Sequence, residues 1–350
     1  MLAFLGAALA SAAVAWAVPV HETPLWAWVL LVLCVDVAHV WATLFRVYLD
    51  GEELRRRAGL YFAAPLIAYV GGVLAHQVSA GFFWRCFAYV AALHFVRQQV
   101  GWMVLYGRRN KDSAGTVRFD QAAIYAATLG PLVWWHANLP RPFSWFMDGD
   151  FVTGLPTPVG IAALAVHALI LVAWVVDALY RSTRGEPLHR GKFVLLAATW
   201  IAWFGGIVLA ESDTTFTAMN VMLHGVPYFV LLYRYAKSRH AEGGYGKWGL
   251  ILRAGVPGFV GFLLALAFVE ELLWDRFVWH ERPMLFGSPG LELGPEALAL
   301  VVPLLSLPQA THYLLDGFVW RTREDPKLVP RLGWARPAVA SVDHRGQPAL

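Results

Sequence analysis

Four histidines lie inside separate hydrophobic stretches of the chain: His39, His94, His224 and His312. Imidazole is a common ligand of transition metals in proteins. Each histidine stands 7 to 14 residues before the first basic residue that follows its stretch, which is about 10 to 21 Å along a helix axis. Because membrane helices are tilted to different degrees, the four histidines can lie closer in depth than these distances indicate. The pattern therefore predicts four imidazoles that converge on one metal or cofactor within a membrane bundle.

Each of these histidines has a polar neighbour three or four positions away, on the same helical face. The neighbours are Asp36 for His39, Arg97 and Gln98 for His94, Asn220 for His224, and Gln309 and Asp316 for His312. One imidazole nitrogen binds a metal while the other needs a partner that sets the tautomer and the ring orientation.

We therefore predict that Asp36, Asp316 and Arg97 belong to the reaction centre and that Gln98, Asn220 and Gln309 support the cofactor. Arg97 would balance charge or position a polar group of the substrate.

The donor set favours iron. The two cysteines, Cys34 and Cys86, form no CxxC pair, so a thiolate site and a structural zinc are disfavoured. Nitrogen ligands with at most a carboxylate suit Fe²⁺, with another transition metal or haem as alternatives. His167 has a depth similar to that of His94 and is a reserve ligand. The alternative for each histidine is a hydrogen bond between helices with no cofactor.

The composition predicts an integral membrane protein that spans the membrane many times. Hydrophobic residues make up 58% of the 350 residues and charged residues 15%, whereas soluble domains carry roughly a quarter charged residues. The net charge of +4 is explained by basic loops at a cytoplasmic face. No nucleic-acid partner is expected; the expected partners are membrane lipids and an apolar small molecule from the lipid phase.

The expected fold is an all-α transmembrane bundle, residues 1–322, followed by a polar and disordered cytoplasmic tail, 323–350. Ten apolar stretches are long enough to span a bilayer: 2–19, 25–46, 60–78, 81–106, 119–137, 156–180, 192–210, 214–234, 249–272 and 296–320. Most Lys and Arg residues fall in alternate connections, which predicts cytoplasmic termini and a bacterial inner (plasma) membrane location. The first stretch could instead be a secretory signal, although it lacks a basic start.

Two connections rich in aromatic residues, 137–155 and 275–294, face the other side in this topology. Trp and Phe favour the membrane interface, so anchoring is one role for these segments. A lid over a lipid-accessible pocket is the other.

The histidines stand singly on different predicted spans, within Asp36-Val-Ala-His39, Leu93-His94-Phe95 and Asn220-Val-Met-Leu-His224. In this layout the chain resembles the Brp/Blh family, polytopic membrane proteins that cleave β-carotene to retinal with a His-ligated iron. The resemblance implies a metal role for His39, His94 and His224, and carotenoid cleavage. Two features depart from it: Asn220 stands where a second histidine would complete a His-x-x-x-His pair, and His312 with Asp316 is additional.

The function expected from these residues is that of a membrane oxygenase, which uses a His-ligated iron and O₂ on a lipid, isoprenoid or carotenoid. A haem-binding electron carrier is an alternative, although stacked haems need histidines at two depths. A transporter with a proton or ion relay through buried His, Asp and Arg is another.

Overall fold

The computed structural model describes residues 1–17, 23–288, 290–321 and 324–333, and within these ranges every regular element is a helix. The predicted all-α class is confirmed. The α-helices are α1 Leu2–Ala17, α2 Leu25–Trp28, α3 Ala38–Trp41, α4 Thr43–Arg46, α5 Gly51–Arg56, α6 Ala58–Val78, α7 Ala80–Asn110, α8 Ala114–His136, α9 Thr157–Thr183, α10 Arg190–Trp200, α11 Asp213–Ala241, α12 Gly249–Arg253, α13 Gly255–Trp274, α14 Pro283–Phe286, α15 Pro295–Leu305, α16 Leu307–Val319 and α17 Leu328–Arg331. Three π-helical segments, η1 Val29–Val37, η2 Ile201–Val208 and η4 Asp275–Trp279, and the 3₁₀ turn η3 Gly246–Trp248 complete the list.

Six helical segments of the described chain are long and apolar enough to cross a membrane, which is compatible with an integral membrane protein. They are Leu25–Arg46, Ala58–Val78, Thr157–Thr183, Arg190–Val208, Asp213–Ala241 and Gly255–Trp279. The pair α15 and α16, bent by 41°, adds a seventh if it is counted as one span.

The remaining three predicted spans correspond to α1, α7 and α8, which fall outside this set. Helix α1 has 16 residues, fewer than the roughly 20 that a hydrocarbon core requires. Helices α7 and α8 are long enough, with 31 and 23 residues, but they carry more polar side chains, such as Gln98 and Gln99 on α7 and Asp120 on α8. The ten-span count and the orientation of the termini stay predictions.

Serine caps set the start of the two longest helices that carry site histidines. The Ser79 hydroxyl accepts from the Phe82 N–H at the start of α7, and the Ser212 hydroxyl accepts from the Thr215 N–H at the start of α11. Such caps satisfy amide groups that have no partner within the helix. At the other end of α7, Lys111 adopts a left-handed conformation, with φ of 60°, and stops the helix.

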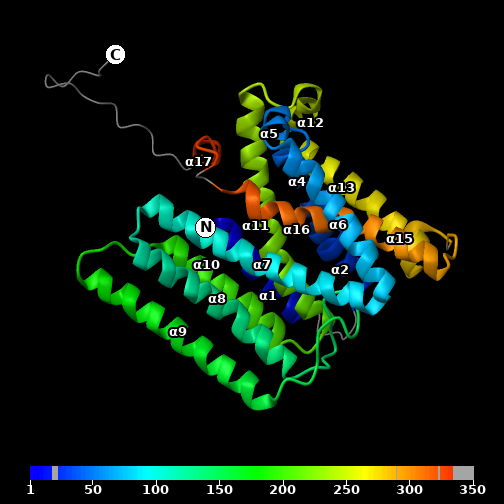
Figure 1. The fold of residues 1–350 in the computed structure, drawn as a ribbon. Coiled ribbons are helices and arrows are strands. Elements are labelled where there is room, and N and C mark those ends of the chain that lie inside the picture. Colours follow the sequence, from blue (N-terminus) through cyan, green and yellow to red (C-terminus); the bar gives the residue numbers. More distant parts are fainter. Residues whose placement is uncertain (18–22, 289, 322–323, 334–350) are drawn as a thin grey trace.

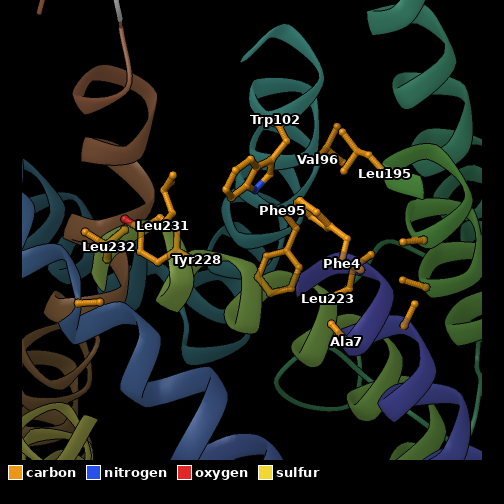
Figure 2. Packing of buried hydrophobic residues seen from close by; sticks show 14 of the residues in the cluster. Phe4, Ala7, Phe95, Val96, Trp102, Leu195, Leu223, Tyr228, Leu231 and Leu232 are labelled. Atoms are coloured by element: carbon orange, nitrogen blue, oxygen red, sulfur yellow. The ribbon is translucent and has the colours of Figure 1, made fainter. Parts of the chain in front are cut away.

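The core lies where α1, α7, α10 and α11 meet (Figure 2). Phe4 of α1 packs edge-on against Trp102 of α7, with ring centroids 5.1 Å apart, and Ala7 faces Leu223 of α11. Helix α9 lies at the outer edge of the molecule and packs along α8 (Figure 1). The helices that carry the four histidines therefore lie in or beside the core, away from α9.

The first residues of the predicted polar tail form a packed segment. Residues 324–333 contain α17, where Leu328 is completely buried. Arg331 pairs with Glu242 at 2.6 Å, and Arg46 pairs with Asp325 at 3.0 Å. These ion pairs tie the segment to the ends of α4 and α11. The rest of the predicted disordered tail, 334–350 and residue 323, lies outside the described residues.

Candidate metal centre

The four histidines come together although they lie on four separate helices: α3, α7, α11 and α16. The ring centroid of His39 is 4.6 Å from that of His224 and 5.1 Å from that of His312. The ring of His94 is 5.0 Å from His224 and 4.6 Å from His312. Each of these pairs meets edge to face, so the rings form a closed set in which His39 and His94 both contact the other two.

Three of the four histidines bring possible ligand atoms close together. One nitrogen each from His39, His224 and His312 lies within 4.8 Å of the others. With metal–imidazole bonds of about 2.0–2.1 Å, three nitrogens arranged around one ion lie roughly 3–3.6 Å apart. The three rings must therefore move together, by up to roughly 1–2 Å, to seat an ion. His94 lies beside this triad and is not one of its members.

Several imidazole nitrogens in this cluster are buried and have no hydrogen-bond partner. All four histidines are at most 5% exposed. The Nε2 atom of each, and in addition Nδ1 of His224, has no hydrogen-bond partner. Buried polar atoms in proteins are nearly always paired, and an unpaired one costs about 1–3 kcal/mol. Five such atoms in one place fit a metal ion bound through Nε2.

The Nδ1 atoms of two histidines are held by partners that the sequence analysis did not identify. His39 Nδ1 lies 3.1 Å from the Val35 carbonyl oxygen of η1, and His312 Nδ1 lies 2.8 Å from the Thr43 hydroxyl of α4. With Nδ1–H as the donor to each oxygen, Nε2 is the free, metal-binding nitrogen. A π-helical segment such as η1 is frequent at functional sites, and here it ends directly before the helix that carries His39.

His224 is held by stacking. Its ring lies parallel to that of Phe95, with centroids 3.6 Å apart and planes 8° apart. Phe95 follows His94 directly on α7, so one turn of that helix supplies both an imidazole and the surface that orients a second one. Tyr228 is a further neighbour that was not predicted, and its ring lies 5.1 Å from that of His312. Spacing could have revealed both Thr43, which follows His39 by four positions, and Tyr228, which follows His224 by four.

The two predicted acids lie near the rings without forming hydrogen bonds to them. Asp36 Oδ1 is 3.8 Å from His39 Nδ1, and Asp316 Oδ2 is 3.9 Å from His94 Nδ1. Asp316 instead accepts from the Tyr228 hydroxyl at 3.2 Å and from the Trp320 indole at 2.5 Å. Both carboxylates are thus close enough to influence the rings electrostatically.

Two of the three predicted supporting residues have partners away from the imidazoles, and the third has none. Asn220 donates to the Phe216 carbonyl at 2.9 Å, and Gln309 donates to the Glu270 carboxylate. Gln98 is buried and neither of its amide atoms has a partner.

Arg97 is exposed and donates to the Tyr125 hydroxyl of α8 at 3.1 Å. The expectation that Arg97 balances charge or positions a substrate group stays a prediction. Arg97 forms no ion pair with any described acid.

His167, the reserve ligand, lies elsewhere. Its Nδ1 is 2.7 Å from the Ala126 carbonyl oxygen of α8, and its ring stacks on Phe204 of η2 at 5.9 Å. The helix that carries it, α9, packs on the outer side of α8. His167 serves helix packing here.

A glycine permits the close approach of the two helices that bring His39 and His224 together. A Cβ atom at Gly225 would lie 2.7 Å from Val35 Cγ1 and 3.2 Å from the Val35 carbonyl oxygen. Any side chain at this position would push α11 away from η1, and glycine is the residue that allows backbones to come this close.

Two cavities adjoin the histidines. The tryptophan cavity, of about 280 Å³, is lined by Trp28, Trp84, Trp145, Trp274 and Trp279 together with Asp36, Asn220 and Gln309. The arginine cavity, of about 720 Å³, is lined by Arg97, Arg108 and Arg321 together with His94, Gln98 and Asp316. Tyr313 lines both. The aromatic segments 137–155 and 275–294 thus supply part of a cavity wall, through Trp145 and Trp279.

Comparison with known proteins gives no family for this chain, since no family model, no curated protein and no solved structure matches it. The functional argument therefore depends on the geometry described above.

Proposed function

We propose that the chain is a multi-pass protein of a bacterial inner membrane in which His39, His224 and His312, with His94 beside them, hold one ferrous ion. The proposed activity is an O₂-dependent oxidation or cleavage of a lipid or isoprenoid. The observation that carries the proposal is the set of unpaired Nε2 atoms on four buried and mutually contacting imidazoles. In all-nitrogen coordination with open positions, ferrous iron binds and activates O₂.

The residues around the cluster suit such a reaction. The Val35 carbonyl oxygen fixes the tautomer of His39, the Thr43 hydroxyl orients the ring of His312, and Phe95 fixes the plane of the His224 ring. Buried aromatic rings around the cluster exclude water, which protects reactive intermediates from side reactions. The arginine cavity, which His94 lines, falls within the range of roughly 300–1,000 Å³ that is usual for small-molecule sites.

Carotenoid cleavage, the activity implied by the resemblance to the Brp/Blh family, is a special case of this proposal. It requires the cavity beside His94 to accept a long polyene. The aromatic lining, with Trp102, Tyr313 and Trp320, supports an extended apolar substrate of this type.

A haem carrier is less well supported. The rings of His39 and His224 are in edge-to-face contact at 4.6 Å, which leaves no slot for a macrocycle between them. A proton or cation relay is the second candidate function, because the tryptophan cavity brings Asp36, Glu271 and Glu281 together on one side of the cluster.

Metal content tests the proposal. The purified protein, reconstituted anaerobically with Fe²⁺ and desalted, is expected to retain about one iron per chain. A His39→Ala, His224→Ala double variant is expected to lose that iron, because two of three close ligands are gone. His167→Ala is the matched control, since it removes a buried histidine outside the cluster and leaves the ligands intact.

Nitric oxide is a probe for the open coordination position, since its ferrous complex has a characteristic electron paramagnetic resonance spectrum. That signal is expected in the unmodified protein and in His167→Ala. Iron retained by the double variant, or no stoichiometric metal in the unmodified protein, would overturn the proposal. Proton uptake by metal-free protein in vesicles would then favour the relay.

A further inference from the structure

The arginine cavity extends along α7 and opens to the lipid phase of the proposed membrane. Its lining runs from Val90 to Arg108, about 27 Å of helix axis. Leu93 is 59% exposed and Leu314 of α16 is 38% exposed, and both line the cavity near its His94 end. A molecule dissolved in the bilayer can therefore enter sideways between α7 and α16.

The cavity is lined by three arginines and two acids. Of the acids, Asp316 accepts hydrogen bonds from Tyr228 and Trp320, and Glu324 pairs with Arg57 at 2.5 Å and with Arg321 at 3.4 Å. Three arginines, Arg97, Arg108 and Arg321, line the same space. Arg97 donates to the neutral Tyr125 hydroxyl and forms no ion pair with a described residue. Arginines inside membrane proteins usually have an anionic partner, so an anion is expected from outside the chain.

Gln98 points independently to a polar ligand group. Its side chain is buried, with 7% of the residue exposed, it lines the cavity, and its amide oxygen and nitrogen both lack a partner. Buried amides are almost always hydrogen-bonded in folded proteins. Gln98 follows Arg97 directly and lies one helical turn beyond His94, so a charged donor and a neutral amide flank the same stretch of the cavity.

The residues of α7 that line the cavity form a short polar part with apolar parts on either side. Arg97 and Gln98 follow His94 by one helical turn, Val90 and Leu93 precede it, and apolar residues from Val100 to Leu105 lie between Gln98 and Arg108. A linear amphiphile matches this order if its head meets the arginines and its chain lies toward the lipid opening. His94 would then be closest to the carbons that adjoin the head.

We propose that the arginine cavity binds a single-chain amphiphile with an oxyanion head, a carboxylate or a phosphate, held by Arg97 and Gln98. The proposal deepens the proposed function, because it names the substrate class of the same centre. A cavity of about 720 Å³ lies within the usual range for one small ligand, roughly 300–1,000 Å³. One chain fits this space better than the two chains of a phospholipid.

Equilibrium binding of radiolabelled oleate to the full-length protein in detergent tests the proposal. Oleyl alcohol is the matched neutral ligand, with the same chain and no charge. The unmodified protein is expected to bind oleate at least about tenfold more tightly than oleyl alcohol, because a guanidinium–oxyanion contact is a charge-assisted hydrogen bond. Comparing oleyl phosphate with oleate shows whether the site prefers a phosphate or a carboxylate head. Comparing inorganic phosphate with oleyl phosphate shows whether the hydrocarbon chain contributes to binding.

Substitutions at the residues proposed to bind the oxyanion head test where the head lies. Arg97→Gln and Gln98→Leu are each expected to weaken oleate binding while leaving oleyl alcohol unaffected, and Arg97→Lys is expected to retain most of the affinity. Arg85→Gln is the control, since Arg85 lies on α7 outside the cavity and contacts the Gly149 carbonyl at 3.1 Å.

Equal affinities for oleate and oleyl alcohol, or unchanged binding in Arg97→Gln, would overturn the proposal. Binding of inorganic phosphate as tight as that of oleyl phosphate would overturn the role of the chain. All measurements are made with the protein as purified and after chelation. If the protein holds its metal but binds oleate no more tightly than oleyl alcohol, only the proposed substrate class is overturned. If it prefers oleate but holds no stoichiometric metal, only the proposed metal centre is overturned.

Discussion

Gly225 offers a quantitative test of the helix contact that forms the histidine cluster. In Gly225→Ala the new methyl group would lie 2.7 Å from Val35 Cγ1. Ordinary contacts begin at 3.4 Å, so α11 and η1 must separate by up to 0.7 Å. Metal ligands tolerate deviations of only about 0.2 Å. The separation would move His224 and His39 apart by more than a bound ion accepts.

The expected result is a clear loss of metal affinity with a modest loss of stability. Displacement of metal-supporting groups typically lowers affinity about 10–100-fold, and we expect Gly225→Ala to fall in that range. The steric cost of overpacking, about 1–3 kcal/mol, is partly offset by the better helix propensity of alanine, about 1 kcal/mol. The net destabilisation is therefore about 0–2 kcal/mol.

Anaerobic Fe²⁺ titration, with thermal unfolding measured in parallel, is the assay. Gly71→Ala is the control, because Gly71 is also inside a helix but has no atom within 4 Å of the added Cβ. This control should bind iron normally and unfold at the same or a higher temperature. If Gly225→Ala behaves like Gly71→Ala in both measurements, then the tight contact between α11 and η1 does not position the two imidazoles.

Two further predictions concern the support of the cluster and the packed C-terminal segment. Thr43→Val removes the hydroxyl that lies 2.8 Å from His312 Nδ1 and should weaken iron binding about 10–100-fold, whereas Thr43→Ser should retain it; equal affinities in the two variants would contradict the role of this hydroxyl in orienting the His312 ring. The hydrogen bond from Arg331 holds the pKa of the Glu242 carboxyl below its ordinary value, so the pair stabilises the fold above that ordinary pKa and the contribution disappears as the pH falls through the lowered pKa. Glu242→Gln should therefore lower the thermal unfolding temperature at neutral pH and have no effect at pH values below the lowered pKa, and a difference that persists there would refute the electrostatic origin.

Local sequence features determined the class of the protein and the helices that carry the candidate ligands. Long apolar stretches predict helices because every backbone polar group must be satisfied within the segment when no water is available. The stretches around His39, His94, His224 and His312 are helical, and the side chains of all four are buried. The helical state of these stretches and the enclosure of their histidines in apolar surroundings both follow from residues within a few helical turns of each other.

Only the tertiary structure decided which rings meet and what holds them. The rotation of each helix about its axis, its tilt and its depth are set by packing against other helices, and no single stretch contains that information. Packing places His167 against Ala126 and leaves it outside the cluster, and it directs Arg97 to Tyr125 and away from the acids.

The orientation of the His312 ring likewise depends on a hydroxyl 269 positions away in the chain, that of Thr43. The spacing of residues therefore determined that four imidazoles are buried in helices. Helix packing, with Gly225 at a close contact between α11 and η1, determined that the four rings meet in one cluster.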